Sequence, residues 1–323
     1  MNKTRFKTKE GLIIMRKIKK IFLIVLCVIF TAQMTVLTGA SEIISDDEVN
    51  FVTSELELMR QLKYLSYEEL VDLGYSSEEI ENIEHVVYMQ FAEAIFERAQ
   101  KSEAELRDLG HSDEQIAIFK SDSFKDITNI YNYLSSDIVD IEPLIFASVT
   151  GTISMVSAST ASITARFDWE WSSAPFFRGT DMIAVRWQGS DSAGRPLNVA
   201  YCSTQSRHWA FYYVGNDFIG MGRNPGATVY PYESAQVTFH MTMWSPNHIR
   251  NGWARRGYYQ VRVNRVGTAA INEVAFVFAY GHSTLGITPG ASFSGLSISF
   301  NFGVSREFHG AVRIRSNGTL IPV

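Results

Sequence analysis

The chain has 323 residues, a formal net charge of −5 at pH 7 and 46% hydrophobic residues. Its length suits one large or two modest domains, each with its own core, and its acidic balance argues against nucleic acid as a partner. No motif in it names a specific chemistry, and the informative features are an export signal, a duplication and an uneven distribution of charge.

Residues 1–40 have the parts of an export signal. Basic residues are concentrated in 16–20, an uncharged apolar run covers 21–37, and small residues lead to Ala40. This order is typical of a secretory signal peptide. We expect cleavage after Ala40, with residues 1–14 as an upstream extra leader, and a secreted or extracellular protein. If the signal stays uncleaved, the apolar run serves as a membrane anchor.

Removal of the signal leaves Cys202 as the only cysteine, so the mature chain has no intrachain disulfide. Many secreted animal domains depend on disulfides, and an exported chain without them fits an extracellular protein of a Gram-positive bacterium better. Cys202 is either a reactive thiol or a buried small hydrophobe. Its place six residues before His208 makes a catalytic cysteine–histidine pair the less favoured interpretation.

Residues 66–83 and 102–119 carry the same short pattern, offset by 36 positions. Both contain Leu-x-Asp-Leu-Gly-x-Ser, in which the glycines are Gly74 and Gly110. The agreement is too extensive for chance in segments this short. It indicates an internal duplication, which predicts an architecture and not a chemistry.

Each copy predicts a helical hairpin. A Ser-x-x-Glu/Gln box, in which the serine caps one free amide and the later residue reaches back to the serine N–H, occurs twice per copy. The boxes are Ser66 with Glu69, Ser76 with Glu79, Ser102 with Glu105, and Ser112 with Gln115. The glycine between two boxes suits the left-handed end of a helix. We expect an acidic helical domain over 41–142 that acts as a spacer or interaction arm, with a peptide-binding bundle as the alternative.

Charge divides the chain sharply. Residues 41–150 hold 25 acidic and 7 basic residues, whereas residues 151–323 hold 8 acidic and 14 basic residues, all of them arginine. Serine and threonine crowd the junction, so residues 143–162 are predicted to be a linker or a first strand. The opposite charges also predict docking of the acidic helices on the arginine-rich part of the same molecule.

From residue 163 the pattern has the period of a β-strand. In residues 166–171 the aromatic side chains share one face and the charged ones the other. Similar runs occupy 182–187, 199–203, 237–243, 258–266, 274–280, 296–302 and 311–315. These runs predict an antiparallel β-sandwich or barrel over 163–323. The expected fold class is α+β by segregated domains, with N-terminal duplicated helical hairpins before this β domain.

Catalytic and metal sites have little support in the sequence. The histidines are dispersed without metal-binding spacing, so we expect no metal and no other cofactor. Glycoside hydrolases use paired carboxyl groups, and Trp169-Glu170-Trp171 is the most suggestive position, because indoles raise a carboxyl pKa by desolvation. Strand alternation, however, places Glu170 on the face opposite both tryptophans. The prediction therefore leans towards a protein that is not an enzyme.

Binding surfaces are better supported, because the β region is dense in aromatic residues and its basic residues are all arginine. Guanidinium groups recognise phosphate and carboxylate in a bidentate manner and tolerate stacking on rings. Several arginines surround Trp253, and others fall on the polar faces of strands. The predicted ligand-binding residues are Trp244, Arg250, Trp253, Arg255, Arg256, Arg262, Arg313 and Arg315.

These observations favour an exported bacterial protein with a non-catalytic β domain that binds an anionic or glycan surface ligand. The partner classes are a cell-wall polymer, a lipid head group at a membrane surface and an acidic glycan. One alternative is a membrane-active pore-forming protein, because residues 149–163 and 296–302 alternate polar and apolar side chains as barrel-forming hairpins do. A second alternative is a secreted glycan-active hydrolase.

Overall fold

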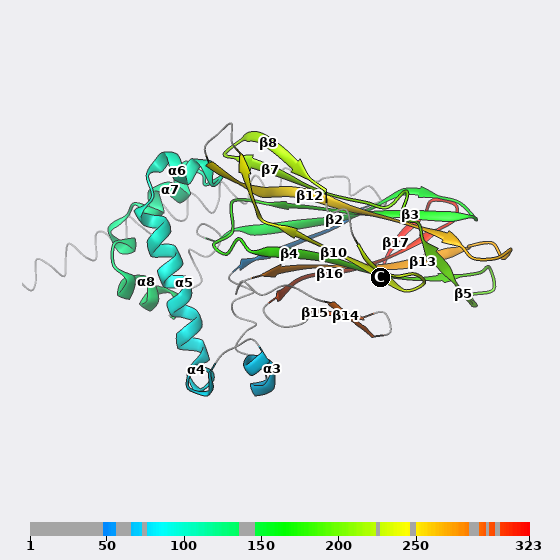
Figure 1. Ribbon diagram of the computed structural model, residues 1–323, viewed down its shortest axis with the longest axis horizontal. Coiled ribbons are helices and arrows are strands. Elements are labelled where there is room, and N and C mark those ends of the chain that lie inside the picture. Colours follow the sequence, from blue (N-terminus) through cyan, green and yellow to red (C-terminus); the bar gives the residue numbers. More distant parts are fainter. Residues whose placement is uncertain are drawn as a thin grey trace, which may run out of the picture. The chain divides into compact units, whose positions relative to one another are not determined.

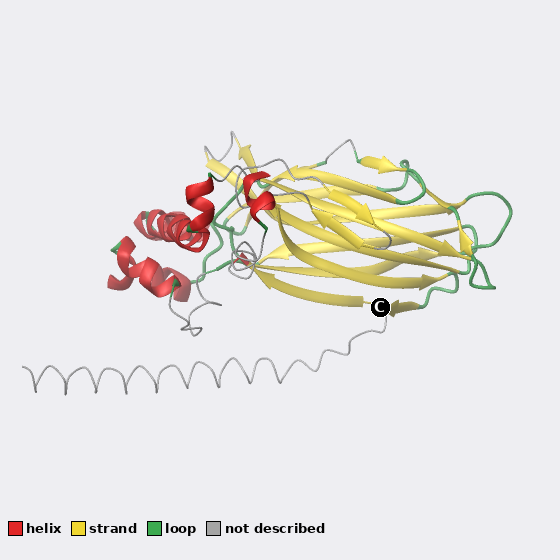
Figure 2. Ribbon diagram, turned by 90° about the horizontal axis from the view of Figure 1, so that it is seen from below, coloured by secondary structure: helices red, strands yellow, loops and turns green. Residues whose placement is uncertain are grey.

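The computed structural model describes residues 48–55, 66–72, 76–135, 146–223, 227–245, 250–283, 291–294, 297–300 and 304–323. All of them belong to one compact unit, Asp46–Val323. This unit consists mostly of two antiparallel sheets, and a few helices complete it (Figure 1, Figure 2). The predicted signal region, residues 1–40, lies outside the described residues.

The helices follow one another between residues 67 and 134. Their bounds are α3 (Tyr67–Asp72), α4 (Ser77–Glu81), α5 (Ile83–Gln100), α6 (Glu103–Asp108), α7 (Asp113–Phe119), the 3-10 helix η1 (Asp122–Phe124) and α8 (Ile127–Leu134). Helix α6 begins with a capping box, in which Ser102 Oγ accepts a hydrogen bond from Glu105 N at 3.2 Å and Glu105 Oε2 accepts one from Ser102 N at 2.8 Å. The boxes that begin α4 and α7 have the same geometry. Gly74 lies outside the described residues.

Helix α5 organises the helical part, although the duplication lies on either side of it. Its Phe91 and Ile95 are buried and belong to one hydrophobic cluster with Leu106, Ile116 and Phe119 of the second copy. Helices α4, α7 and α8 all contact α5. The short helices therefore gain their apolar contacts from a longer neighbour, because a hairpin of two short helices buries too little surface by itself.

Sheet A has the strand order β1-β2-β3-β12-β7-β8, with β6 and β11 also paired to β12. Its strands are β1 (Glu48–Ser54), β2 (Ser148–Ala158), β3 (Ser162–Trp171), β6 (Val199–Tyr201), β7 (Arg207–Val214), β8 (Asp217–Gly222), β11 (Thr242–Ser245) and β12 (Arg250–Arg265). Residues 149–163, which support the pore-forming alternative, form β2 and the start of β3. The expected antiparallel pairing is confirmed in every pair of this sheet.

Sheet B has the order β17-β16-β13-β4-β10-β9, with β5 beside β4. Its strands are β4 (Thr180–Ser190), β5 (Pro196–Leu197), β9 (Thr228–Tyr230), β10 (Ser234–His240), β13 (Glu273–Ser283), β16 (Val304–Arg315) and β17 (Leu320–Pro322). The hairpin of β14 (Ala291–Ser294) and β15 (Ser297–Phe300) forms a separate small sheet. Its Ile298 packs with Val277 and Ala279 of β13, which explains why β13 is apolar on both faces.

Strand β1 lies within the range 41–142 that the sequence predicts to be helical, and that part of the prediction is wrong. The segment Glu-Val-Asn-Phe-Val-Thr-Ser is rich in β-branched and aromatic residues, which favour strands. It pairs with β2 along its whole length, from Glu48 opposite Ser154 to Ser54 opposite Ser148. The described part of the acidic half therefore starts with a strand of sheet A.

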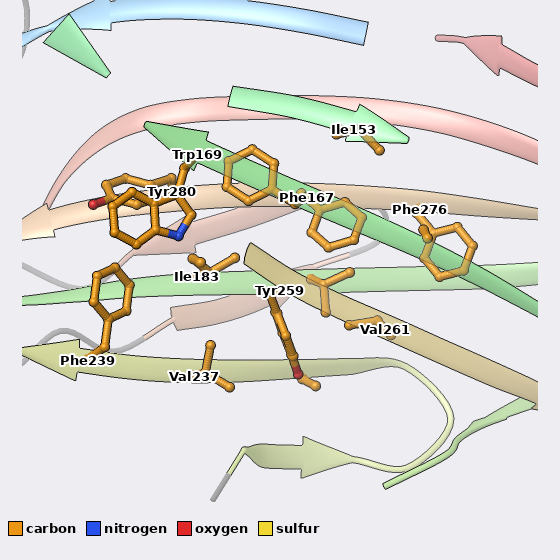
Figure 3. Close-up of a cluster of buried hydrophobic side chains, with 14 of the residues drawn as sticks. Ile153, Phe167, Trp169, Ile183, Val237, Phe239, Tyr259, Val261, Phe276 and Tyr280 are labelled. Atoms are coloured by element: carbon orange, nitrogen blue, oxygen red, sulfur yellow. The ribbon is translucent and has the colours of Figure 1, made fainter. Parts of the chain in front are cut away.

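Side chains from both sheets form one core. Phe167 of sheet A stacks on Phe278 of sheet B with ring centroids 5.8 Å apart, and Trp169 stacks on Phe239 at 5.0 Å. Figure 3 shows Phe167, Trp169 and Phe239 converging from facing strands. The predicted alternation in β3 is confirmed, because its aromatic side chains are buried whereas Glu170 is exposed.

The turn between α6 and α7 inserts into the β region. Leu109 belongs to the core cluster of the sheets, and its carbonyl accepts a hydrogen bond from Ala174 N at 2.8 Å. The carbonyl of Asp108 accepts hydrogen bonds from Gly215 N at 2.6 Å and from the indole Nε1 of Trp253 at 3.3 Å. The second copy of the duplication is thus joined to the sheets through backbone carbonyls.

Candidate ligand-binding site

A groove with a volume of about 390 Å³ lies on the outer face of sheet A. It crosses β2, β3, β12 and β7, so four strands that are distant in sequence contribute to one surface. The groove is lined by Thr150, Thr152, Arg166, Asp168, Trp169, Glu170, Phe211, Arg256 and Gly257. Its lining is therefore mostly polar and charged, with one phenyl ring at the side of β7.

Strand geometry explains how the charged groups reach this face. Side chains alternate along a strand, so the buried aromatic residues of β3 leave Arg166, Asp168 and Glu170 on the outside. In β12 the register against β7 shifts between Ala254 and Arg256, and Arg255 has no cross-strand partner on β7. Such a bulge bends the strand and re-aims its side chains.

Most charges in the groove are paired. Arg166 Nε donates to Asp168 Oδ1 at 2.9 Å, and its guanidinium lies 3.9 Å from the ring centroid of Tyr258. Arg255 Nε lies 3.5 Å from Glu170 Oε1. Arg256 is exposed, and its guanidinium lies 5.6 Å from the centroid of the Tyr213 ring. Among the described residues, no carboxylate lies within ion-pair distance of Arg256, so this groove presents one uncompensated positive charge.

Of the predicted site residues, Arg256 lines the groove, and Arg255 lies beside it in an ion pair with Glu170. Arg262 lies on the same face of β12, about 20 Å along the strand from Arg256, where it donates to Asn264 Oδ1 at 3.1 Å and Ser162 Oγ at 2.7 Å. Trp253 does not reach the surface: it is 1% exposed and packs against the turn of the second helical copy.

The remaining predicted residues are elsewhere. Arg313 and Arg315 lie on β16 in sheet B, where both guanidinium groups flank Glu273 at 3.7 and 3.4 Å. The backbones of Trp244 and Arg250 belong to β11 and β12, but their side chains lie outside the described part of the chain. The eight predicted residues therefore do not form one surface.

The sequence did not point to the other half of the groove. Thr150 and Thr152 lie in the stretch predicted to be a linker or first strand, and Phe211 was one of many aromatic residues. The polar face Arg166-x-Asp168-x-Glu170 was visible as an alternation. Its pairing with β2 and β12 was the missing information, because that pairing decides which side chains become neighbours.

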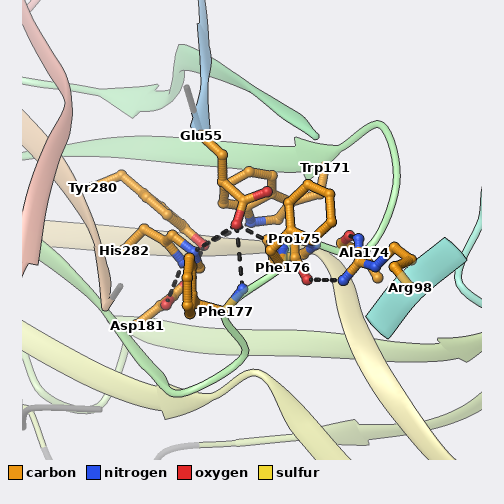
Figure 4. A network of polar contacts seen from close by, with 10 residues as sticks. All are labelled: Glu55, Arg98, Trp171, Ala174, Pro175, Phe176, Phe177, Asp181, Tyr280 and His282. Atoms are coloured by element: carbon orange, nitrogen blue, oxygen red, sulfur yellow. Dashed lines mark hydrogen bonds and ion pairs between the residues drawn. The ribbon is translucent and has the colours of Figure 1, made fainter. Parts of the chain in front are cut away.

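A second group of charged side chains is completely buried. His282 Nδ1 lies 2.9 Å from Asp181 Oδ1, and His282 Nε2 lies 3.8 Å from Glu55 Oε1. The hydroxyl of Tyr280 donates to Asp181 and accepts a hydrogen bond from Trp171 Nε1 at 3.0 Å. Figure 4 shows the two carboxylates on either side of the imidazole ring.

This buried network connects three parts of the chain: the end of β1 with Glu55, β4 with Asp181, and β13 with His282. Glu55, the residue after β1, accepts hydrogen bonds from Phe176 N at 2.6 Å and Phe177 N at 3.3 Å. Burial by itself lowers the pKa of His282, but Asp181 and Glu55 outweigh it and hold the pKa well above its usual value. The three charged side chains are 0% exposed, so the network has no side-chain surface at which a substrate could bind.

Arg98 of α5 joins the helices to the same region (Figure 4). It is 4% exposed, donates to Ala174 O at 2.7 Å and Pro175 O at 2.8 Å, and lies 4.0 Å from the centroid of the Phe176 ring. Burial lowers the pKa of Arg98 to about 9, an effect that Glu55 opposes, so the guanidinium stays charged at neutral pH.

Cys202 is partly exposed in the turn after β6, with its Sγ 3.4 Å from Thr204 Oγ1. That hydrogen bond lowers the pKa of its thiol. Neither ring nitrogen of His208 has a hydrogen-bond partner among the described residues, so the structure shows no cysteine–histidine pair there. Within the same residues, no group of three or more His, Cys, Asp or Glu side chains is arranged to hold a metal ion, and no helix combines the length and apolarity needed to span a membrane.

Comparisons with known proteins show resemblance at the level of distant structures only. No family model and no curated protein matches the chain. A solved structure of manganese lipoxygenase of Gaeumannomyces graminis with part of zonadhesin of Komagataella pastoris aligns at 6% identity and a TM-score of 0.24, over 53% of this chain and 49% of that one. AvmM, which catalyses macrocyclization in alchivemycin A biosynthesis, aligns at 9% identity and a TM-score of 0.25, over 52% of this chain and 87% of that one.

Proposed function

We propose that this chain is an exported, non-catalytic binding protein that holds an acidic glycan in the groove on the outer face of sheet A. The observation that carries the proposal is Arg256, an exposed guanidinium in a groove whose other charges are already paired. An unpaired arginine is a ready partner for a carboxylate, because its planar fork of N–H groups matches the two carboxylate oxygens.

The rest of the lining suits a hydroxyl-rich ring. Thr150 and Thr152 offer hydroxyl groups, and the Arg166–Asp168 pair offers both donors and acceptors in fixed positions. The Phe211 ring supplies an apolar face of the kind on which the faces of sugar rings pack. A volume of about 390 Å³ has room for a few sugar units, within the size range of small-ligand sites.

The fold supports a binding role for this surface. In this proposal the two sheets form a β-sandwich, and the aromatic stacks between Phe167 and Phe278 and between Trp169 and Phe239 hold the groove floor rigid. A pre-formed surface loses little conformational entropy when it binds a ligand. The export signal predicted in residues 1–40 places such a surface where extracellular glycans occur.

The proposal is tested by calorimetric titration of the full chain with oligogalacturonate and with a neutral oligoglucan. We expect oligogalacturonate to bind, and Arg256→Gln to weaken binding about tenfold, equivalent to about 1.4 kcal/mol. The affinity of the unaltered protein should also fall with added salt, because salt screens exposed charges. Arg313→Gln is the matched control, because it removes an equal charge from sheet B and should leave the affinity unchanged.

Two outcomes contradict the acidic-glycan proposal. Equal weakening by Arg256→Gln and Arg313→Gln would show that net charge, and not the groove, attracts the ligand. Binding to phosphatidylglycerol vesicles without binding to oligogalacturonate would assign the surface to lipid head groups.

A glycan-active hydrolase is the second candidate, because Asp168 and Glu170 both line the groove. Side chains two residues apart on a strand start about 7 Å from each other, within the separation that glycoside hydrolases use. Each of the two carboxylates lies beside an arginine, whereas such an enzyme needs one carboxyl that donates a proton. Release of new reducing ends from oligogalacturonate, abolished by Glu170→Gln, would replace the binding role with this one.

A further inference from the structure

A second cavity, of about 160 Å³, lies on the inner face of sheet A. Tyr201, His208 and Tyr259 line it from sheet A, and Val229 and Val237 line it from sheet B. Figure 3 shows Tyr259 and Val237 extending from facing strands into the same interior space. The cavity is separate from the outer groove, because side chains on opposite faces of β12 line the two spaces.

His208 is the unexplained group of this cavity. Its side chain is 2% exposed, and neither Nδ1 nor Nε2 has a hydrogen-bond partner among the described residues. The ring packs 5.0 Å from the centroid of Phe239 and 6.2 Å from that of Tyr259. Burial lowers the pKa of His208 to about 3, so the ring is neutral at pH 7 and offers one N–H donor and one lone pair.

A buried polar group without a partner costs free energy, and native proteins contain few of them. A bound water molecule or a ligand usually supplies the missing hydrogen bond of such a group. The hydroxyls of Tyr201 and Tyr259, 3.3 Å apart, provide further polar positions in the same cavity. Burial raises the pKa of Tyr259 well above its usual value, so its hydroxyl keeps its proton.

The remaining lining adds apolar walls and positive charge. Val229, Val237 and Ala227 give the cavity an apolar side, while Arg207 and Arg223 are exposed where they line it. Among the described residues, no aspartate or glutamate lines the cavity, and neither arginine has a carboxylate within ion-pair distance. The volume resembles that of an apolar cavity of about 150 Å³ that holds one benzene ring.

We propose that this cavity binds a small carboxylic acid with a ring-sized apolar body. The carboxylate pairs with Arg207 and Arg223, the body lies against Val229 and Val237, and a hydroxyl group on the far side of the body exchanges hydrogen bonds with His208. This site goes beyond the proposed glycan groove, since it takes a different ligand on the opposite face of the sheet.

The test uses the full chain and 4-hydroxybenzoate, with 4-hydroxybenzamide as the uncharged probe of the same shape and benzoate as the probe without the hydroxyl group. For a ligand of this size we expect a dissociation constant of about 1 mM or tighter. The amide should bind at least about tenfold more weakly, because it cannot form ion pairs. The imidazole nitrogen resonances of His208 should shift when 4-hydroxybenzoate is added.

Variants separate the two parts of the site. The double variant Arg207→Gln, Arg223→Gln alters exposed side chains and should weaken binding of 4-hydroxybenzoate at least about tenfold. Arg265→Gln, also exposed but outside the cavity lining, should not. His208→Phe keeps an aromatic ring in place and should remove the preference for 4-hydroxybenzoate over benzoate.

Measurements on the unaltered protein can contradict the proposal, so the test does not depend on whether any variant folds. If none of the three probes binds at about 10 mM, or if the His208 resonances stay unchanged while a probe binds, the cavity holds solvent water and the proposal is wrong. Unchanged affinity in the double arginine variant would likewise remove the carboxylate from the proposal.

Discussion

The imidazole Nδ1 of His282 lies 2.9 Å from Oδ1 of Asp181, and both side chains are completely buried. Glu55 flanks the other ring nitrogen, so one histidine is held between two carboxylates from distant parts of the sequence. Buried ion pairs contribute little net stability compared with an apolar replacement, but removal of one partner leaves an uncompensated charge. The network therefore makes the fold sensitive to changes in any of its members.

Asp181→Asn should lower the free energy of unfolding by about 3–5 kcal/mol, because it leaves the His282 charge with a single distant carboxylate. Urea titration at neutral pH measures this effect. The control is Asp122→Asn, whose carboxylate forms an exposed ion pair with Lys125, and exposed pairs contribute little. If the two variants lose equal stability, the buried pair has no special role.

The same pair predicts loss of stability at alkaline pH. The folded pKa of His282 is raised, so its contribution is fully present below the unfolded value of about 6.5 and is lost as pH rises through the folded pKa. The slope is at most about 1.4 kcal/mol per pH unit for one group. Unfolding titrations between neutral and alkaline pH should show this slope in the native protein, and the same slope in His282→Gln would contradict it.

His111 predicts the opposite behaviour in acid. Burial lowers its pKa to about 3, and the nearby charge of Arg98 adds to the effect. Because the folded pKa is depressed, stability is present above the unfolded value of about 6.5 and is lost as pH falls towards 3. His111→Gln should flatten the acid limb of the stability curve, whereas His240→Gln, at an exposed position, should not. If stability falls equally steeply at acid pH in both variants, groups other than His111 cause the loss of stability in acid.

Gly110 and Gly194 form a matched pair for the contact between helices and sheets. Both have positive φ, 80° and 73°, so alanine costs about 1–2 kcal/mol of backbone strain at either site. A Cβ on Gly110 would lie 3.1 Å from Cζ2 of the buried Trp253, whereas nothing lies within 4 Å of a Cβ on Gly194. Gly110→Ala should therefore lose more stability than Gly194→Ala in thermal unfolding, and equal losses would mean that Trp253 gives way freely.

The elements that local chemistry determines were predictable from the sequence. The capping boxes of Ser76, Ser102 and Ser112 begin helices where the pattern predicted them, because a cap acts within four residues of chain. The burial of Trp169 beside an exposed Glu170 likewise follows from the period of one strand.

Features that depend on pairing between distant segments were not predictable. The groove needs β2, β3, β12 and β7 as neighbours, and the buried network needs Glu55 beside His282, residues more than two hundred positions apart. The sequence predicted Trp253 to be a surface residue, because the arginine and glycine residues on either side of it are typical of a loop. These residues instead form a long strand with a bulge. Periodicity predicts which side of a strand is buried, but it does not predict which other strands pair with that strand or pack against it.

The capping boxes of the duplication give a last prediction. In the second copy, both α6 and α7 begin with such a box. Ser102→Ala should destabilise the protein by about 1 kcal/mol, because Glu105 N loses its acceptor at the start of α6. The double variant with Glu105→Ala should cost less than the sum of the single changes, since both residues belong to one hydrogen-bonded unit. Chemical denaturation of the single and double variants gives the coupling energy. Ser192→Ala, at an exposed loop serine, is the control, and strict additivity of the box changes would mean that Ser102 and Glu105 stabilise the helix start independently of each other.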